Sequence, residues 1–426
     1  MCTRTRLLLS TFSIPAAILS VLSTALPAQA QVYRAYDVYD SVGVNTHWYY
    51  GDGYQYSTHF PALVSLMQQA QIRHFRDGVF SVGTNTPASL TQMYSTMASK
   101  GMHADLIVPQ STVISADELV AGLQKYPGLE SIEPPNEWDI HGGPNWASTL
   151  MAEEPAILQA GREMHVPVLG PSLTQPASFI KLGSLAQYMD FNNLHMYSGG
   201  RNPENGGWGG PDSEGNYYGS VAFELDLSKI DGPGKRSIAT ETGYRTASQA
   251  SQGAIPDSVE AIYAPRLILE HFKKGIKRSY FYELIDDPSN VQPGYGLLKY
   301  DLTPKPAFTA IKNLLGILAD SNTPFTPADL DYSLTGSTQG VETLLVQKSQ
   351  GGVYWLAVWL SGSIYDVNAL QATPIPPQTV TLILPGGKTA NYVGKFDATG
   401  QTVSSWPNRS TYTFQATSGV TMIRIK

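Results

Sequence analysis

Two glutamates in this chain lie at, or a few residues beyond, the end of a predicted strand. Glu137 lies in the segment Glu-Pro-Pro-Asn-Glu-Trp-Asp (residues 133–139), after the apolar run 129–132. The two prolines cannot continue a sheet ladder, so the predicted strand ends there. Glu241 ends the predicted strand 236–241 and is followed by Thr-Gly. Two carboxyl groups that face each other across a cleft can act as an acid and a nucleophile, which is the chemistry that cleaves glycosidic bonds.

Each glutamate also has an interpretation without chemistry. Glu137 could be a solvated turn carboxylate, and Glu241 could form a purely structural ion pair with Arg76. The prolines and Trp138 beside Glu137 favour partial desolvation, which would raise the pKa of its carboxyl group toward the range of a general acid. Because both carboxylates are present, catalysis is the favoured hypothesis.

The elements that must position these groups alternate between strands and helices over residues 38–318, which predicts βα units around a parallel sheet. Strands are predicted at residues 41–46, 72–76, 104–109, 129–132, 166–170, 191–195, 236–241 and 279–284. Helices are predicted at residues 60–71, 87–100, 116–125, 145–165, 177–189, 220–229, 258–274 and 306–318. Eight such units match an α/β fold of the (β/α)8 TIM barrel type, whose active sites lie at the carboxyl ends of the strands. A doubly wound sheet is the alternative, but no Gly-rich phosphate loop follows the first strand.

The pattern changes after about residue 320. Short alternating or β-branched segments follow, separated by Gly-Gly, Pro-Pro and Asn/Asp turns, at residues 344–348, 353–360, 379–384, 390–396 and 420–425. They predict a smaller C-terminal antiparallel β-sandwich. We therefore predict a catalytic barrel at residues 31–320 and a β-sandwich domain at residues 321–426, packed together without a flexible linker.

The first 30 residues have the pattern of a signal peptide. Arg4 and Arg6 precede an apolar stretch over residues 7–26, and Ala-Gln-Ala at residues 28–30 fits a small-x-small cleavage site. We expect the mature chain to be secreted or periplasmic. An uncleaved anchor is the alternative, and it is disfavoured because Ser and Pro interrupt the apolar stretch. No other stretch is long and apolar enough to span a bilayer, so no membrane partner is expected after cleavage.

Composition excludes several kinds of chemistry. The only cysteine is Cys2, within the predicted signal peptide, so the mature chain is expected to have no disulfide, no Cys-ligated metal and no Cys nucleophile. The net charge of −7 argues against a nucleic acid as a partner. The His and Asp residues show no metal-ligand spacing such as His-Glu-x-x-His. We therefore expect neither a metal nor an organic cofactor.

In the pair Asn136-Glu137 and in Glu241, the chain resembles a clan of retaining glycoside hydrolases on (β/α)8 barrels. This clan includes the family 5 cellulases and the family 39 xylosidases. In that clan an Asn-Glu pair ends strand four and its Glu is the acid/base, while a Glu at the end of strand seven is the nucleophile. The resemblance covers about residues 40–318. It implies the acid/base role for Glu137 and the nucleophile role for Glu241.

The same resemblance implies further site residues. Arg76, at the end of strand two, would lie near the nucleophile, and His195 and Tyr197, after strand six, would border it. Each has an alternative: His195 could be a satisfied core histidine, Tyr197 could simply pack, and Asn136 could form an Asx turn instead of binding a sugar hydroxyl. Strand eight ends in Tyr-Glu-Leu (residues 282–284), where many relatives place a Trp that stacks on the substrate.

Four more residues are candidates for substrate contact. His47 and Trp48 follow strand one and could either pack in the wall of the site or contact a sugar. Trp208 lies in a long Gly-rich loop after strand six, where its ring could stack on the substrate. Glu283 could bind a sugar hydroxyl or act as a supporting acid behind the site.

Together these residues predict an enzyme that hydrolyses β-glycosidic bonds in a polysaccharide or oligosaccharide by a retaining double displacement, with that carbohydrate as its partner. In a retaining enzyme the two carboxyl groups lie about 5–5.5 Å apart, whereas an inverting enzyme needs more than about 6.5 Å. We favour an endo-acting enzyme with an open cleft. A barrel protein that binds carbohydrate without catalysis and a transglycosylase with the same carboxylate pair are the alternatives.

Overall fold

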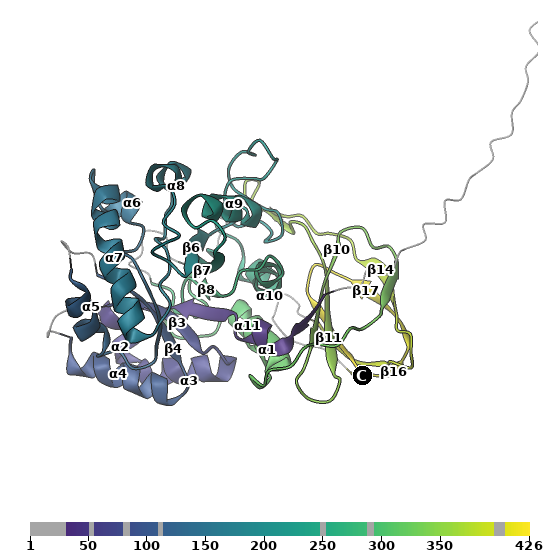
Figure 1. Ribbon diagram of the computed structural model, residues 1–426. Helices are drawn as coiled ribbons and strands as arrows, with labels where there is room; N and C mark the ends of the chain where they lie inside the picture. The colour runs from purple at the N-terminus through teal and green to yellow at the C-terminus, as the bar shows by residue number, and fades with distance from the viewer. Residues whose placement is uncertain are drawn as a thin grey trace, which may run out of the picture.

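The computed structural model describes residues 31–50, 55–79, 86–109, 114–247, 253–287, 294–395 and 405–426. These residues form two bodies that lie side by side (Figure 1). One consists of parallel strands with helices around them, and the other consists mainly of antiparallel strands from the C-terminal part of the chain. The predicted signal peptide, residues 1–30, lies outside the described residues. Among the described helices, none combines the length and apolar character that crossing a membrane requires.

The first body is built on a single sheet of seven parallel strands, hydrogen-bonded in the order β5-β4-β3-β2-β8-β7-β6. The strands are β2 (Val42–Asn45), β3 (His74–Gly78), β4 (His103–Ile107), β5 (Leu129–Glu133), β6 (Phe191–Met196), β7 (Arg236–Thr242) and β8 (Ser279–Phe281). Every pair in the sheet is parallel. The carboxyl ends of all seven strands therefore meet at one edge of the sheet, which is where side chains after different strands can converge.

The eighth strand of the predicted barrel is reduced to a bridged segment. Two isolated parallel bridges, Ile132–Val168 and Leu169–Phe191, join this segment to β5 on one side and to β6 on the other. The segment thus connects the two edge strands of the sheet, which is curled like a barrel. Pro167 has no N–H to donate to a ladder, and this shortens the strand that the sequence predicts here.

Helices pack along the outside of this sheet (Figure 1). They are α1 (Ala35–Tyr39), α2 (Gln55–Thr58), α3 (Phe60–Ala70), α4 (Ala88–Ser99), α5 (Ala116–Leu123), α6 (Trp138–His141), α7 (Trp146–Met164), α8 (Pro176–Leu182), α9 (Val221–Asp231), α10 (Asp257–Lys273) and α11 (Pro306–Leu318), with a 3-10 turn η1 at Trp48–Tyr50. The helix predicted at residues 177–189 is wrong in length. It ends at Leu182 because Gly183 adopts a left-handed φ of 65°.

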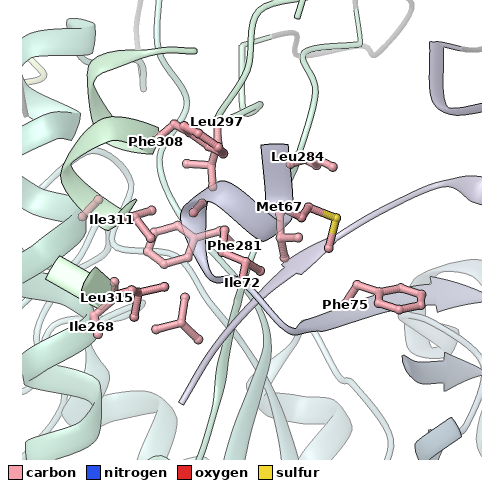
Figure 2. Close-up of a cluster of buried hydrophobic side chains, with 14 of the residues drawn as sticks. Met67, Ile72, Phe75, Ile268, Phe281, Leu284, Leu297, Phe308, Ile311 and Leu315 are labelled. Carbon is pink, nitrogen blue, oxygen red and sulfur yellow. The ribbon is translucent and has the colours of Figure 1, made fainter. Parts of the chain in front are cut away.

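Apolar helix faces fix the sheet in place. Figure 2 shows Ile311 and Leu315 of α11 beside Ile268 of α10 and Phe281 of β8, all of them buried. Ile311, Leu315 and Leu318 follow the i, i+4, i+7 spacing that puts side chains on one helix face. Burying each such side chain contributes roughly 1.5–3 kcal/mol to folding, so this packing sets the positions of the strand ends that carry the site.

The second body contains two main antiparallel layers, as the sequence predicts for a sandwich. A six-stranded sheet has the order β1-β10-β11-β18-β15-β16, and a three-stranded sheet has the order β17-β14-β9. The strands are β1 (Val32–Arg34), β9 (Ser333–Gly336), β10 (Val341–Gln347), β11 (Tyr354–Leu360), β14 (Gln378–Ile383), β15 (Ala390–Lys395), β16 (Ser405–Arg409), β17 (Thr411–Ala416) and β18 (Thr421–Ile425), with a small hairpin of β12 (Tyr365–Asp366) and β13 (Gln371–Ala372). Strand β1 pairs in parallel with β10, so the first described residues belong to the sheet of the C-terminal body.

Buried polar contacts hold the two bodies together. Arg266 of α10 donates to Glu204 from the loop between β6 and α9, and also to the carbonyl of Gly362 after β11. Trp359 of β11 donates its indole N–H to the same Glu204 carboxylate at 2.9 Å. Because these partners are largely buried, the barrel loop and the sandwich are fixed relative to each other, as the sequence analysis expects.

Candidate active site

The strand ends bring most of the predicted site residues into one hydrogen-bonded group. Arg76 lies on β3, His195 on β6 and Glu241 on β7, while Glu137 follows β5. Each comes from a different strand, so only the closure of the curled sheet brings them together. Tyr197 follows β6 directly and joins the same group through Glu241.

Glu241 is held by two donors. The guanidinium of Arg76 donates to Oε1 at 2.8 Å, and the hydroxyl of Tyr197 donates to Oε2 at 2.9 Å. Burial and the charge of Glu241 raise the pKa of Tyr197 well above its ordinary value, so its hydroxyl stays protonated and donates. The carboxylate is 8 % exposed. The two donors fix the position of the carboxylate, as a nucleophile needs.

Arg76 is the centre of the buried part of the site. Its guanidinium donates to Asn45 Oδ1 at 3.0 Å, to Asn136 Oδ1 at 2.6 Å and, through Nε, to Glu133. Burial alone would lower the pKa of Arg76, but the charges of Glu133 and Glu241 outweigh burial and raise it further above the ordinary range. Arg76 is therefore a permanent, fully paired cation that fixes the positions of Glu241 and Asn136.

Glu137 has an unusual backbone conformation. Its φ and ψ are both 45°, in the left-handed region that residues other than glycine seldom adopt. Holding a residue in this conformation costs roughly 1–3 kcal/mol. Its backbone N–H donates to Ser172 Oγ at 3.2 Å, and its carboxylate accepts from His195 Nδ1 at 2.7 Å. These contacts hold the carboxyl group toward the site instead of in a solvated turn.

The electrostatics of Glu137 differ from the sequence-based expectation. Burial raises the pKa of its carboxyl group, but the hydrogen bond and the charge of His195 outweigh burial, and the net direction is down. For His195, burial lowers the pKa, while the charge of Glu241 and the bond to Glu137 outweigh it and raise the pKa. The prediction of a raised pKa for Glu137 is therefore wrong for this structure of the site. That prediction did not include the hydrogen bond from His195.

The two glutamates are close enough to act on one substrate atom. One carboxylate oxygen of Glu137, one of Glu241 and a ring nitrogen of His195 all lie within 4.8 Å of one another. This trio also has the donor types of a cation site. The Arg76 guanidinium, 2.8 Å from Glu241, already neutralises part of that charge and would repel a metal ion. The expected lack of a metal cofactor stays a prediction.

A second polar pair borders the site at β2 and β8. His47 Nε2 lies 3.2 Å from Glu283 Oε2. Burial raises the pKa of Glu283, and the nearby His47 ring partly offsets that rise. The His47 ring contacts Tyr282, which contacts Tyr295 edge-on, and Tyr295 in turn contacts Tyr197. An aromatic wall therefore connects the Glu283 pair to the ring that binds Glu241.

The two predicted tryptophans lie apart from this group. Trp48 is only 2 % exposed and packs edge-on against Tyr56 and Phe60. Of its two predicted roles, this is packing and not contact with a sugar. Its backbone N–H donates to the carboxylate of Asp77. Trp208 is 53 % exposed on the loop after β6 and contacts the ring of Tyr218. Substrate contact by Trp208 stays a prediction.

Sequence reasoning missed the polar residues inside the sheet. Glu133 pairs with Arg76 and accepts from Asn193 Nδ2, while Thr240 donates to Asn193 Oδ1. Asn45 bonds Arg76 and donates to the carbonyl of Thr240 at 2.9 Å. All of these residues lie within strands of the sheet. Polar residues at alternate positions of otherwise apolar strands were the available signal.

Comparison with known proteins identifies the fold. No family model matches the sequence, and no curated protein matches it. Solved structures do match: a family 39 glycoside hydrolase from the gut symbiont Bacteroides cellulosilyticus has a TM-score of 0.61 at 14% identity, over 93% of this chain and 82% of that one. The fold is that of the family 39 glycoside hydrolases.

Two further structures agree with this result. The family 39 enzyme from Xanthomonas axonopodis pv. citri has a TM-score of 0.54 at 14% identity, over 94% of this chain and 96% of that one. A glucosidase from Croceicoccus marinus has a TM-score of 0.58 at 12% identity, over 85% and 91% of the two chains. The likeness to the two family 39 structures covers 93% and 94% of this chain, so it includes residues of both bodies.

Proposed function

We propose that this protein is a retaining glycosidase that hydrolyses β-glycosidic bonds in an oligosaccharide or polysaccharide. The observation that carries the proposal is the closeness of the two carboxylates, since one oxygen of Glu137 and one of Glu241 lie within 4.8 Å of each other. Retaining enzymes hold their carboxyl groups about 5–5.5 Å apart, and inverting enzymes need more than about 6.5 Å to admit a water molecule between carboxylate and sugar. The family 39 fold supports the same chemistry.

In the first step Glu241 attacks the anomeric carbon. A bond forms between a carboxylate oxygen and that carbon while the bond from the carbon to the leaving oxygen breaks. Glu137 donates its proton to the leaving oxygen. Arg76 and Tyr197 orient Glu241 before attack, through bonds of 2.8 and 2.9 Å. The product of this step is a glycosyl ester on Glu241.

In the second step a water molecule replaces the leaving group. Glu137, now a carboxylate, takes a proton from the water as the water oxygen bonds to the anomeric carbon. The ester bond breaks, and its electron pair returns to Glu241. His195 donates to Glu137 at 2.7 Å and so orients this carboxylate in the form that the second step needs. Two displacements at one carbon leave the anomeric configuration unchanged.

Location follows from the N-terminal sequence. The basic start, apolar stretch and Ala-Gln-Ala site support export through a signal peptide. We propose that the mature enzyme acts on glycans outside the cytoplasm. Detection of the mature N-terminus at Gln31 in exported protein tests this, and a retained full-length chain would contradict it.

Azide rescue tests the two catalytic roles. Wild type, Glu137→Ala and Glu241→Ala are assayed on aryl β-glycosides and on β-glucan, xylan and mannan. Azide should rescue Glu137→Ala with a β-glycosyl azide as product, and Glu241→Ala with the α-azide. Activity that survives both substitutions would place the chemistry elsewhere.

The same panel separates the alternatives. A binding protein would bind a glycan without turnover on any substrate. A transglycosylase would transfer the glycosyl group to an added sugar acceptor in preference to water.

A further inference from the structure

A pocket outside the catalytic group lies where the barrel meets the sandwich. It has a volume of about 400 Å³ and is lined on the barrel side by the loop between β6 and α9, and on the sandwich side by the segment that contains β12. In Figure 1 this sandwich segment reaches across to the teal loop beside α9. Neither body alone forms the pocket.

Direct contacts fix both walls of the pocket. Arg201 donates to Gly199 O at 3.0 Å within the barrel loop and to Asn368 Oδ1 at 3.3 Å across the junction. Asp366 accepts the backbone N–H groups of Asn368 and Ala369, both at 2.9 Å, which shapes the opposite wall. The pocket is thus pre-formed instead of depending on a ligand to assemble it.

The lining has the chemistry of a sugar subsite. Tyr217 is 49 % exposed, so part of its ring is available to stack on the C–H face of a pyranose. Asn205, Asn368 and Ser363 supply amide and hydroxyl groups that can bond sugar hydroxyls. A pocket of this volume has room for at least one sugar ring.

Charge in the pocket favours a neutral ligand. Arg201 is the cation of the lining and Asp366 is its carboxylate. Backbone N–H groups, with a smaller contribution from the charge of Arg201, lower the pKa of Asp366, so this carboxylate is ionised near neutral pH and its charge offsets that of Arg201. The lining therefore has no excess positive charge that would attract a uronate or a sulfated sugar.

The pocket is linked to the catalytic group through the chain. Tyr197, which donates to Glu241, is four residues before Arg201. Ser198 Oγ donates to the carbonyl of Arg201 at 2.9 Å, so this connection is a tight turn. The barrel wall of the pocket and the Tyr197 donor are therefore parts of one short stretch of the loop after β6.

We infer that this pocket, defined by Arg201, Asn205, Tyr217, Ser363, Asp366 and Asn368, binds a neutral sugar unit of an extended substrate at a distance from the cleaved bond. This inference rests on the proposed glycosidase function for its connection to turnover. It assigns the sandwich a direct part in substrate binding through Ser363, Asp366 and Asn368. It also makes the preferred substrate an oligosaccharide or polymer instead of a simple glycoside.

The test compares short and long substrates. The double variant Tyr217→Ala/Asn368→Ala removes the ring and an amide, and Tyr300→Ala is the matched control, since Tyr300 is 47 % exposed and lies outside the pocket. For the polymer that wild type hydrolyses, KM of the double variant should rise about fivefold or more, which corresponds to ~1 kcal/mol. Its kcat/KM on the matching aryl monosaccharide should match that of wild type and Tyr300→Ala. Equal KM values for the polymer would overturn the inference.

Binding separates failure of this inference from failure of the proposed function. Cello-, xylo-, manno- and laminari-oligosaccharides are titrated by calorimetry into Glu241→Gln and into the same protein with the double substitution, which needs no turnover. Affinity that falls about fivefold in the double variant supports the pocket even if wild type hydrolyses nothing. Equal affinity, or no binding of any of these oligosaccharides, overturns the pocket whatever the outcome for catalysis.

Discussion

Removal of the His195 side chain should shift the pH profile of the proposed enzyme upward. His195 Nδ1 lies 2.7 Å from Glu137 Oε1 and stabilises the ionised carboxylate, which lowers the pKa of Glu137. A group that binds the ionised form lowers a pKa, so its loss raises it. Glu137 must be protonated to act as the acid, and activity should therefore fall at a higher pH in His195→Ala than in wild type.

The structure sets the size of this shift. A hydrogen bond to a charged group contributes about 1.5–3 kcal/mol, and one pKa unit corresponds to about 1.4 kcal/mol. The Glu137 side chain is 22% exposed, so solvent screens part of this interaction. We therefore expect a shift near the lower limit, about one pH unit in the basic limb of kcat/KM.

Two controls isolate the hydrogen bond in this assay. His195→Asn offers an amide N–H near the position of Nδ1, and it should restore most of the wild-type profile. A 2,4-dinitrophenyl glycoside has a leaving group that departs without a proton, so its basic limb should be absent in every variant. An unchanged basic limb in His195→Ala with a poor leaving group would refute the reasoning, as would an equal shift in His195→Asn.

Three further predictions concern the groups around this pair. Tyr197→Phe removes the 2.9 Å bond to Glu241 and should lower kcat/KM about tenfold or more while the thermal midpoint changes little; an unchanged kcat/KM would contradict the role of this hydroxyl. Glu133→Ala removes one of the two carboxylates that pair with the buried Arg76 and leaves its Nε without an acceptor, so it should cost about 3 kcal/mol in the free energy of unfolding, measured by denaturant titration. Its control is Glu342→Ala, which breaks the more exposed pair with Lys273 and should cost about 1 kcal/mol or less; similar losses in both would count against the buried network. Burial raises the pKa of Glu130, but the charges of His74 and Arg278 outweigh burial and lower the pKa to about 2. The ionised Glu130 therefore contributes about 3 kcal/mol to the free energy of unfolding. This contribution is present above about pH 4.5 and is lost as the pH falls toward 2. Glu130→Gln should flatten the stability curve in that window, and a curve with wild-type slope would show that Glu130 is not the group responsible.

The sequence carries enough information to predict the ends of strands better than their interiors. Glu137 and Glu241 are predictable because each lies near a strand end that a proline or a glycine marks in the sequence. The strand predicted at residues 166–170 is reduced to two bridges, because Pro167 has no N–H and the ladder is shortened there. How far a proline shortens a strand depends on the strands beside it. The length of α8 was missed because Gly183 adopts a left-handed φ, which a pattern of apolar residues does not reveal.

The polar residues inside the sheet were harder to predict, because burying any one of them alone would be unfavourable. Glu133 alone would be a buried charge inside a strand, and only the guanidinium of Arg76 from another strand makes it acceptable. That pairing depends on the strand order, because β3 and β5 flank β4 and the two side chains meet across it. Asn193 and Thr240 follow the same logic, since each is satisfied by a residue of a different strand.

The network has a consequence for the proposed cycle. Arg76 is buried and pairs with two carboxylates, Glu133 and Glu241. When Glu241 forms the glycosyl ester it loses its charge, and a cation with no other partner would then be buried uncompensated at a cost of several kcal/mol. Glu133 keeps Arg76 paired in that state, so the ester forms without leaving an isolated charge. The buried ion pair thus connects stability to function, because the contact that holds the strands together also lets the nucleophile change its charge.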